Sequence, residues 1–301
     1  MRSFLDLVDV SGSEIFEILT LSRRGGKVFS EGDSVALVFE KPSLRTRNSC
    51  EVAVKRLGGH PVYIQNSEVG IDTRESAEDI SRTLSTYHRV IAARVFRHNV
   101  LERMVAATSG IGRKLPVINL LSDKSHPCQA IADLLTISDI FSLGNTFSGV
   151  KIAYVGDSNN VAFSLAIAAL KVGAIVAIAS PDEYSFDGDS REFLSSLGEI
   201  SFTTSPREAV GAASVVYSDT WISMGDEEEA DLRRAIFAPT YHVDEALMAN
   251  AGPGAIFMHC LPAHRGEEVS AAVFEANAST IFAQAGNRLD AFQGVLRYCL
   301  A

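Results

Sequence analysis

The segment "VALVFEKPSLRTRNSCEVAVKRLGG", residues Val35–Gly59, determines how the chain begins its fold. Its first five residues are apolar and suited to a strand, and an amphipathic helical pattern runs over Arg47–Leu57. The junction between them, "SLRTR", carries two hydroxyls and two guanidinium groups. A strand that leads directly into a helix is half of an α/β unit, so the segment predicts a parallel sheet with helices packed on it.

The same alternation of apolar runs and amphipathic stretches continues along the chain and predicts an α/β fold. Glycines and small polar residues gather in "SLGNTFSG", Ser142–Gly149, which is the best linker candidate and divides the chain into two α/β domains. The expected strands are Val35–Phe39, Val90–Val95, Val117–Leu121, Lys151–Val155, Ile175–Ala179, Ser214–Tyr217 and Ala255–His259. The expected helices include Arg47–Leu57, Ser76–Tyr87, Gln129–Phe141 and Val161–Val172.

Composition restricts the class of protein. The chain has 301 residues, of which 47% are hydrophobic, so it can bury a large core. A formal net charge of −10 argues against nucleic-acid or anionic-membrane partners. The first residues lack the apolar core of a signal peptide and no later run has the length of a membrane span, so we expect a cytoplasmic protein. The widely spaced cysteines fit reduced thiols, most of them in the core: Cys50, Cys128, Cys260 and Cys299.

Polar side chains occur where several expected strands end, which is where parallel α/β sheets bind ligands. The "SLRTR" junction begins a helix whose free N–H groups favour an anion such as phosphate; the alternative is a serine cap followed by solvent-facing arginines. Arg94 lies in an apolar strand, where an arginine needs either a ligand or a structural partner charge. His126 and Gln129 flank Pro127 at a helix start, where they can meet one small group or serve only in capping.

The segment Val150–Leu170, "VKIAYVGDSNNVAFSLAIAAL", superficially resembles a dinucleotide-binding turn. Only Gly156 stands where that turn needs three glycines, and Asn159 and Asn160 occupy the space that a pyrophosphate requires. We therefore do not expect a nicotinamide cofactor.

Five motifs occur in the order and approximate spacing of one enzyme family. They are "SLRTR" at 43–47, "HPCQ" at 126–129, "DTWISMG" at 219–225, "HCLPAHRGEE" at 259–268 and "NRL" at 287–289. Together they resemble the aspartate/ornithine carbamoyltransferase family, and "SMG" and "HCLPA" resemble its ornithine-using members. The resemblance implies one domain of residues 1–141 plus 286–301, a second domain of residues 149–285, and helices that link the two.

The resemblance also implies roles for individual residues. The N-terminal domain would bind carbamoyl phosphate, with Arg94 bridging the phosphate and the carbonyl oxygen, His126 polarising the carbonyl and Gln129 positioning the amide. Donors aligned in advance lower the barrier of a reaction that expels phosphate while an oxyanion forms. The implied carbamoyl-phosphate set is Ser43, Leu44, Arg45, Thr46, Arg47, Arg94, His126, Gln129, Cys260, Leu261 and Arg288.

The second domain would bind ornithine. The resemblance assigns this to Asn160, Asp219, Ser223 and Met224. Without the resemblance, Asp219 would be interpreted only as a turn residue after a strand. The implied reaction is direct attack of the ornithine δ-amine on carbamoyl phosphate, which gives citrulline and phosphate. Because the amine is the nucleophile, Cys260 needs no covalent role. The implied catalytic residues are Arg94, His126, Asp219 and Cys260.

The "HCLPAH" motif raises the question of a metal. His259, Cys260 and His264 do not share the usual ligand face across a proline, so we expect no metal, a buried His259 and an exposed His264. The resemblance suggests a cis peptide bond before Pro262, no organic cofactor, and a homotrimer or a multiple of trimers. Two other functions stay open: a sister transferase acting on putrescine or an acylated ornithine, and a non-catalytic anion-binding member of the fold.

Several positions depart from the family pattern. Leu44 replaces a usual threonine, although only its backbone should touch phosphate. The loop 66–76 lacks the glutamine that commonly reaches a neighbouring subunit's site. Gly286 and Asp290 replace the usual glutamate and histidine around "NRL". These departures leave open whether the loop completes a neighbour's site and how the last helix docks.

Overall fold

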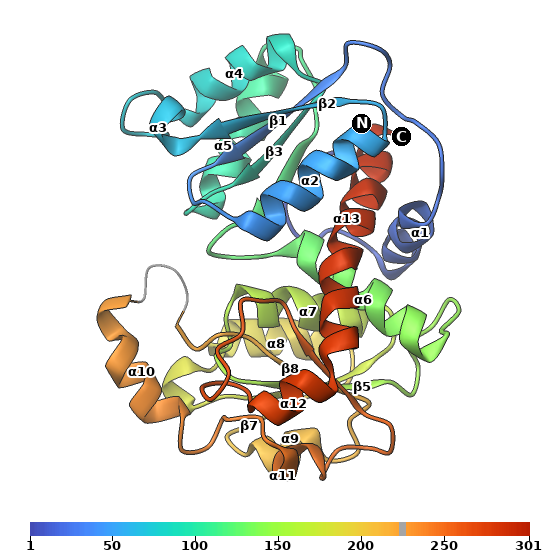
Figure 1. The fold of residues 1–301 in the computed structure, drawn as a ribbon. Coiled ribbons are helices and arrows are strands. Elements are labelled where there is room, and N and C mark those ends of the chain that lie inside the picture. Colours follow the sequence, from blue (N-terminus) through green and yellow to red (C-terminus); the bar gives the residue numbers. More distant parts are fainter. Residues whose placement is uncertain (223–226) are drawn as a thin grey trace. The chain divides into compact units, whose positions relative to one another are not determined.

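The computed structural model describes residues 1–222 and 227–301 (Figure 1). The chain forms two compact units: unit 1 consists of Met1–Ala132 and Gly286–Ala301, and unit 2 of Asp133–Ala285. Both boundaries fall inside helices, α6 (Pro127–Phe141) and α13 (Ala278–Leu300). The segment 142–149, the linker candidate, is a loop that follows α6.

Unit 1 is built on a four-stranded parallel sheet with the order β2-β1-β3-β4. The chain leaves β1 for β2 on one side and then crosses to β3 on the other, so the switch point of this sheet lies between β1 and β3. Side chains at the carboxyl ends of these two strands are therefore placed to meet a ligand. The elements are α1 (Gly12–Ser22), β1 (Ser34–Phe39), α2 (Leu44–Arg56), β2 (His60–Gln65), α3 (Asn66–Val69), α4 (Ala77–Tyr87), β3 (Val90–Arg94), α5 (His98–Gly110), β4 (Val117–Leu121) and the first part of α6.

Unit 2 is built on a five-stranded parallel sheet with the order β7-β6-β5-β8-β9. Its switch point lies between β5 and β8, by the same rule. The elements are β5 (Lys151–Val155), α7 (Asn160–Lys171), β6 (Ile175–Ala179), η1 (Asp182–Tyr184), α8 (Gly188–Leu197), β7 (Ile200–Thr203), α9 (Pro206–Val210), β8 (Val215–Ser218), η2 (Glu227–Glu229), α10 (Ala230–Phe237), α11 (Glu245–Met248), β9 (Ile256–His259) and α12 (Ala271–Ala276).

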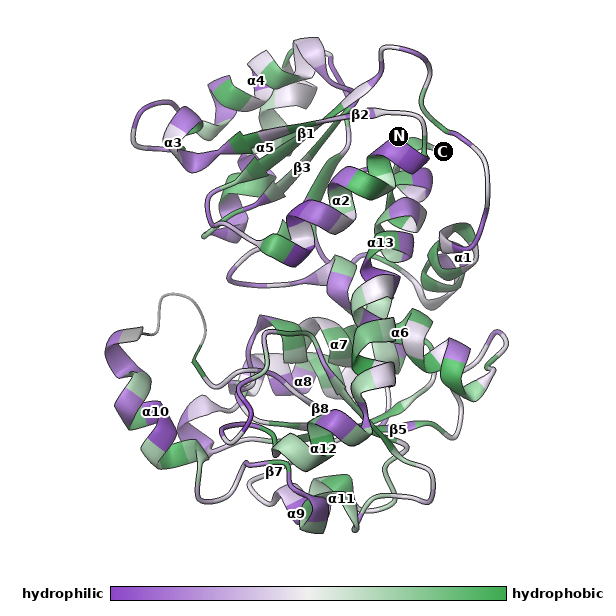
Figure 2. Ribbon diagram, viewed as in Figure 1, coloured by the Kyte–Doolittle hydropathy of each residue, from purple (hydrophilic) through white to green (hydrophobic). Residues whose placement is uncertain are grey.

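Most residues of the inner strands are apolar, as Figure 2 shows for β1 and β3. This pattern is typical of parallel sheets that helices cover on both faces. In unit 1, Val38 and Ile91 of the sheet share a core with Ile80 of α4 and Met104 of α5. In unit 2, buried residues of the sheet share a core with the aromatic side chains of Trp221 and Phe237. Each unit thus has its own hydrophobic core.

The α/β fold class predicted from the sequence is confirmed, and all seven expected strands occur within one residue of their expected ends. Two strands, β2 and β7, were missed. Both are edge strands with only partly buried side chains, and β2 contains Pro61, so neither has the apolar pattern of an inner strand. The helix expected from Arg47 begins earlier, at Leu44, because Ser43 caps it.

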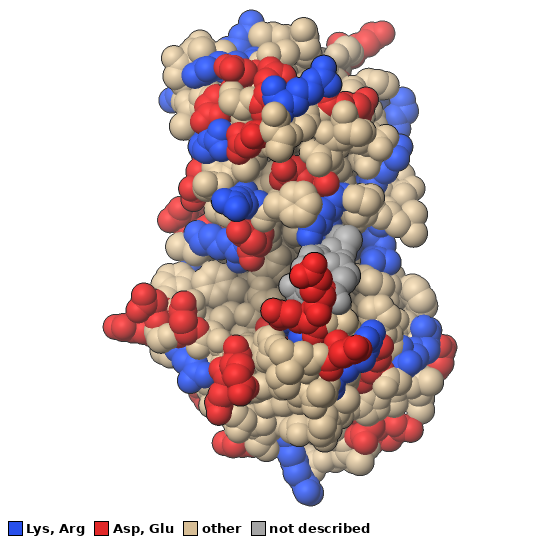
Figure 3. All heavy atoms as spheres, turned by 90° about the vertical axis from the view of Figure 1, so that its left-hand side faces the viewer, with Lys and Arg blue, Asp and Glu red and all other residues tan. Residues whose placement is uncertain are grey.

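The described residues contain no helix that is both long enough and apolar enough to cross a bilayer. Acidic and basic side chains are interspersed over the face shown in Figure 3. The two chain ends lie side by side in unit 1, where the ammonium group of Met1 donates to the backbone oxygen of Ala301 over 3.2 Å (Figure 1).

Candidate active site

The junction after β1 places the start of α2 at the switch point of unit 1. Ser43 has extended backbone dihedrals, and its hydroxyl accepts a hydrogen bond from the backbone N–H of Thr46 over 3.4 Å. The Thr46 side chain is buried, whereas that of Arg45 is only partly so. The Arg47 guanidinium faces solvent, donates to Glu51 over 2.9 Å and lies 3.8 Å from the Tyr63 ring centroid. Thr46 points into the unit and Arg47 out of it.

Arg288 of α13 joins two of the other predicted residues. One of its terminal nitrogens donates to Gln129 of α6, and the other donates to the hydroxyl of Thr46 over 2.7 Å. All three side chains are buried. Residues that are far apart in the sequence therefore form one hydrogen-bonded group at the carboxyl end of β1, and this group fixes the Arg288 guanidinium in place.

Arg94 is the last residue of β3 and lies where the pairing of β3 with β4 shifts register. Its side chain is only 7% exposed, yet no carboxylate within the described residues forms an ion pair with it. The buried Nε atoms of Arg94 and Arg288 also have no hydrogen-bond partner in that part of the chain. Burial, followed by the charges of Arg288 and Arg45, lowers the pKa of Arg94 to about 10. Buried positive charge without a counter-charge is costly, and an anionic ligand would remove the cost.

His126 directly precedes α6 and is buried. Burial is the main cause that holds its pKa well below the usual 6.5, and the Arg288 and Arg94 guanidinium groups act in the same direction. The ring is therefore neutral at neutral pH. A neutral imidazole can still donate one N–H hydrogen bond to a carbonyl oxygen, without adding charge to the arginine pair.

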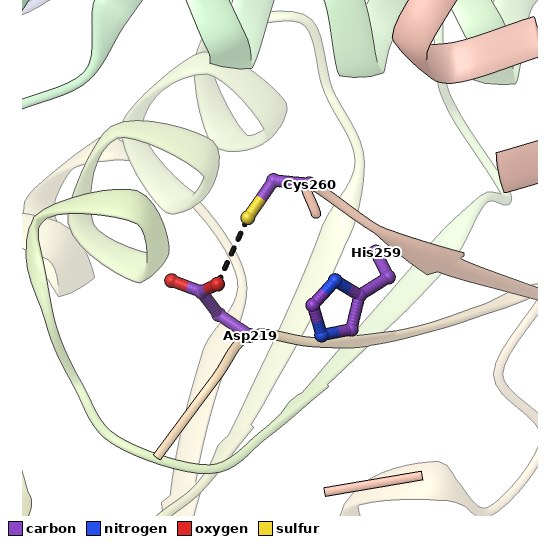
Figure 4. Close-up of side chains that lie close together, drawn as sticks. All are labelled: Asp219, His259 and Cys260. Atoms are coloured by element: carbon purple, nitrogen blue, oxygen red, sulfur yellow. Dashed lines mark hydrogen bonds between the residues drawn. The ribbon is translucent and has the colours of Figure 1, made fainter. Parts of the chain in front are cut away.

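In unit 2, Asp219 is the centre of a polar cluster at the sheet's switch point. It follows β8, and Asn159 follows β5. The Cys260 thiol donates to Asp219 Oδ1 over 2.9 Å, as Figure 4 shows. Asn159 Nδ2 donates to Asp219 Oδ2 over 3.0 Å, and the backbone N–H of Thr220 donates to Oδ1 over 2.8 Å. The Asp219 carboxylate is thus held in one orientation by donors from three segments.

His259 lies behind this cluster and is buried, as expected, while His264 is exposed. The expected cis bond between Leu261 and Pro262 is also present. His259 Nδ1 accepts a hydrogen bond from the backbone N–H of Leu261 over 2.9 Å. Its Nε2 therefore carries the proton, and this atom lies 3.3 Å from a carboxylate oxygen of the fully buried Glu268. This pair fixes the turn that carries Cys260.

Among residues 1–222 and 227–301, two groups of side chains bring possible metal-ligand atoms within 4.8 Å of one another. One consists of Asp219, His259 and Cys260, and the other of His264 with two acidic neighbours at 267 and 268. In the first group, the thiol already bonds to the carboxylate and the imidazole accepts a backbone N–H. These contacts explain the arrangement as a hydrogen-bonded cluster.

Of the other three residues predicted to bind ornithine, the structure describes one, Asn160. Asn160 is the first residue of α7, next to Asn159, and its backbone oxygen accepts from Ser164 over 2.8 Å. Ser223 and Met224 lie outside the described residues. The sequence interpretation did not assign roles to Asn159 and Glu268. An asparagine that precedes a helix is a typical cap, and this capping signal could have identified Asn159.

Comparisons with known proteins agree with this geometry. The model of the aspartate/ornithine carbamoyltransferase carbamoyl-phosphate-binding domain matches residues 2–139, and the model of the Asp/Orn-binding domain matches residues 148–299. The chain belongs to the aspartate/ornithine carbamoyltransferase family. The resemblance predicted from the five motifs is thereby confirmed, and with it the class of enzyme, a carbamoyltransferase.

Individual carbamoyltransferases match over almost their whole length. The chain is 41% identical to an ornithine carbamoyltransferase of Anoxybacillus flavithermus, covering 98% of this chain and 95% of the relative. It is 42% identical to an anabolic ornithine carbamoyltransferase of Pyrococcus furiosus, covering 98% and 95%. Among solved structures, an anabolic ornithine carbamoyltransferase of Campylobacter jejuni has a TM-score of 0.93 at 33% identity, covering 99% of both chains.

The departures from the carbamoyltransferase pattern have local structural explanations. Leu44 is 76% exposed at the first position of α2, so its side chain is not needed for packing. Asp290 accepts a hydrogen bond over 2.6 Å from Arg23, the residue that follows α1. Gly286 has open space around the position of a missing Cβ. The loop 66–76 includes α3, and its residue Asp72 pairs with Arg103 over 2.6 Å.

Proposed function

We propose that the protein is an ornithine carbamoyltransferase, which transfers the carbamoyl group of carbamoyl phosphate to the δ-amine of L-ornithine and releases L-citrulline and phosphate. The observation that carries the proposal is the buried positive charge of Arg94 and Arg288, unbalanced by any acidic partner within the described residues. The choice of ornithine is supported by the relatives, several of which are named ornithine carbamoyltransferase at 41–42% identity over nearly the full length.

We assign carbamoyl phosphate to the domain of residues 1–141 plus 286–301. The phosphate would contact the first turn of α2 with the side chains of Ser43, Arg45, Thr46 and Arg47 and the backbone of Leu44. For Arg47 this requires its guanidinium to leave Glu51, an exposed ion pair that contributes little. Arg94 and Arg288 would neutralise the anion, and Gln129 would accept from the carbamoyl amide.

The carbonyl oxygen would accept hydrogen bonds from Arg94, Thr46 and the neutral His126. Donors held in advance around the oxygen would stabilise the negative charge that develops on it without reorganisation. One such donor is typically worth about 3 kcal/mol of barrier. A neutral His126 fits this role because it can donate one N–H to the carbonyl oxygen without adding a further positive charge beside Arg94 and Arg288.

We assign ornithine to the domain of residues 149–285, with Asn160, Asp219, Ser223 and Met224 as its contacts and with Cys260 and Leu261 beside the reacting groups. A free alkyl amine titrates near 10.4, so the δ-amine must lose a proton before it attacks. Asp219 and Cys260 share a hydrogen bond and present a carboxylate and a thiol to the amine. The amine nitrogen then forms a bond to the carbonyl carbon, the bond from that carbon to the phosphate oxygen breaks, and the leaving phosphate takes the proton that the attacking nitrogen gives up.

The test is citrulline formation from carbamoyl phosphate with saturating L-ornithine, run beside putrescine, N-acetylornithine and L-aspartate. We expect product only with ornithine, and loss of product in an Arg47→Ala variant if the first turn of α2 binds phosphate. Turnover with another amine would keep the anion site and reject the assignment of the acceptor. Absence of turnover with all four amines would reject the proposed function and favour an anion-binding protein.

We further propose a cytoplasmic homotrimer or a multiple of trimers. The support is the family membership. No metal or organic cofactor takes part in the proposed reaction, because the chemistry requires only donors, a carboxylate and a thiol.

A further inference from the structure

Arg233 is a buried arginine of α10 that has no role in the reaction described above. Its NH1 group donates to Asp157 Oδ2 over 2.8 Å and to the backbone oxygen of Trp221 over 3.0 Å. Its guanidinium carbon lies 4.6 Å from the centroid of the Tyr184 ring. A buried guanidinium is stable only with such partners, so its position is closely fixed.

Asp157 and Trp221 belong to the two segments at the switch point of unit 2. Asp157 lies in the turn between β5 and α7, next but one to Asn159. Trp221 lies after β8, next but one to Asp219. Asn159 and Asp219 are joined by their own hydrogen bond of 3.0 Å. Arg233 therefore connects, from the side of α10, the same two segments that the Asn159–Asp219 bond connects at the proposed acceptor site.

The helix that carries Arg233 is itself anchored. Phe237 of α10 is fully buried, and its ring stacks on that of Trp221 with centroids 5.8 Å apart. The Tyr184 ring packs on Phe237 at 5.0 Å. These aromatic contacts fix α10 against the segment after β8. The Arg233 guanidinium, which α10 carries, then holds the turn of Asp157 at a fixed distance from that segment.

We propose that Arg233 is a positioning residue for the acceptor: it sets the spacing between the turn of Asn159 and Asn160 and the segment of Asp219, and so controls the affinity for the amino-acid substrate. This inference rests on the proposed function, because the substrate amine is its readout. Arg233 touches no reacting atom, so its loss should weaken acceptor binding while the carbamoyl-phosphate half is unchanged.

The experiment compares Arg233→Met with Arg234→Met. Arg234 follows on the same helix, but it is exposed and forms surface ion pairs, at 3.2 Å to Glu267 and 3.5 Å to Asp231. Citrulline formation is measured with each substrate varied in turn. For Arg233→Met we expect KM for ornithine to rise about tenfold or more, with KM for carbamoyl phosphate changed less than about twofold. Arg234→Met should resemble the wild type for both substrates.

Two further variants keep the proposal testable if Arg233→Met does not fold. Arg233→Lys keeps the charge but loses the planar fork, so it should raise KM for ornithine by an intermediate factor. Asp157→Asn weakens the ion pair between Asp157 and Arg233, so it should also raise KM for ornithine. An unchanged KM for ornithine in these folded variants, or a fall in kcat alone, would overturn the proposal. If the wild type makes no citrulline, the proposed function fails, whatever the variants do.

Discussion

The buried positive charge of Arg94 destabilises the folded protein but is suited to binding an anion. It ends an apolar strand, is almost completely buried, and has two arginines rather than a carboxylate as its charged neighbours. In the free protein this arrangement costs stability, since a buried charge is neutralised only when a partner is present. Natural proteins keep such unfavourable groups mainly at functional sites. The cost at Arg94 is therefore a physical reason to assign it to the anion.

Replacing Arg94 by methionine should separate stability from activity. We expect kcat to fall by about 10²–10³-fold, because a donor to the developing oxyanion is lost. The melting temperature of the ligand-free variant should equal or exceed that of the wild type, because a buried charge is removed. Inorganic phosphate should raise the melting temperature of the wild type more than that of the variant.

The matched control is Arg97→Met, since Arg97 is exposed three positions later in the sequence. It should keep both the activity and the response to phosphate. A marked loss of stability in Arg94→Met would show that Arg94 supports the fold, and the assignment to the anion would then lose its physical basis.

His126 predicts a pH dependence of stability. Its pKa in the folded protein is held well below 6.5 by burial, Arg288 and Arg94, while the unfolded chain has the ordinary value. Below pH 6.5 the unfolded state therefore binds more protons, so the free energy of unfolding falls as the pH falls. The slope from this residue is at most about 1.4 kcal/mol per pH unit.

Urea denaturation of the wild type and of His126→Gln at pH 7.5, 6.0 and 5.0 measures this effect. The variant should show a smaller fall with pH, although His88 and His98, whose pKa values burial also lowers, keep part of it. The exposed His60 gives the control His60→Gln, which should follow the wild type. Equal slopes for wild type and His126→Gln would contradict a depressed pKa.

At the scale of elements, buried hydrogen bonds determine which helices hold the sheet of unit 2. The Tyr217 hydroxyl of β8 donates to Asp133 Oδ2 over 3.1 Å, and Gln284 Nε2 donates to Asp133 Oδ1 over 2.7 Å. Gln284 also accepts from the backbone N–H of His259 over 3.0 Å. These side chains join β8 and β9 to α6 and α13 within unit 2, and every one of them is buried.

Tyr217→Phe should destabilise the protein by roughly 1–3 kcal/mol, since the buried Asp133 loses a donor. Tyr154→Phe is the matched control, because its ring stacks on that of Tyr217 at 5.7 Å but its hydroxyl makes only a 3.4 Å hydrogen bond to Asn159. Tyr154→Phe should lower the free energy of unfolding by less than Tyr217→Phe does. The comparison requires denaturation curves for the two variants, and a larger loss in Tyr154→Phe would show that the network contributes little.

At the scale of the whole molecule, the proposed trimer is tested by its mass. Light scattering at neutral pH should give three times the 32.4 kDa of one chain, or a multiple of that value. The measurement should be repeated with a reducing agent, because the four cysteines are free thiols and three of them are buried. A mass of 32.4 kDa at micromolar concentration would reject the trimer, while activity in that form would leave the proposed reaction intact.

Much of the fold could be predicted because its signals are local. The seven strands predicted correctly are largely buried and appear as short apolar runs, both the inner strands and the edge strands β4 and β9. The other two edge strands, β2 and β7, have mostly half-buried or exposed side chains, which is why they were missed. Ser43 and Asn159 stand before helices as caps, a pattern that depends only on neighbouring residues.

The sequence by itself determined the α/β class, the order of strands and helices, and the residue types at each strand end, because these depend on periodicity and on short motifs. Only the tertiary structure decided which of those residues act together. Arg288 contacts Thr46 and Gln129, Arg47 donates to Glu51, and Asp219 accepts from both Asn159 and Cys260. Such groupings depend on strand order and on the switch point of each sheet, which bring together residues that are far apart in the chain.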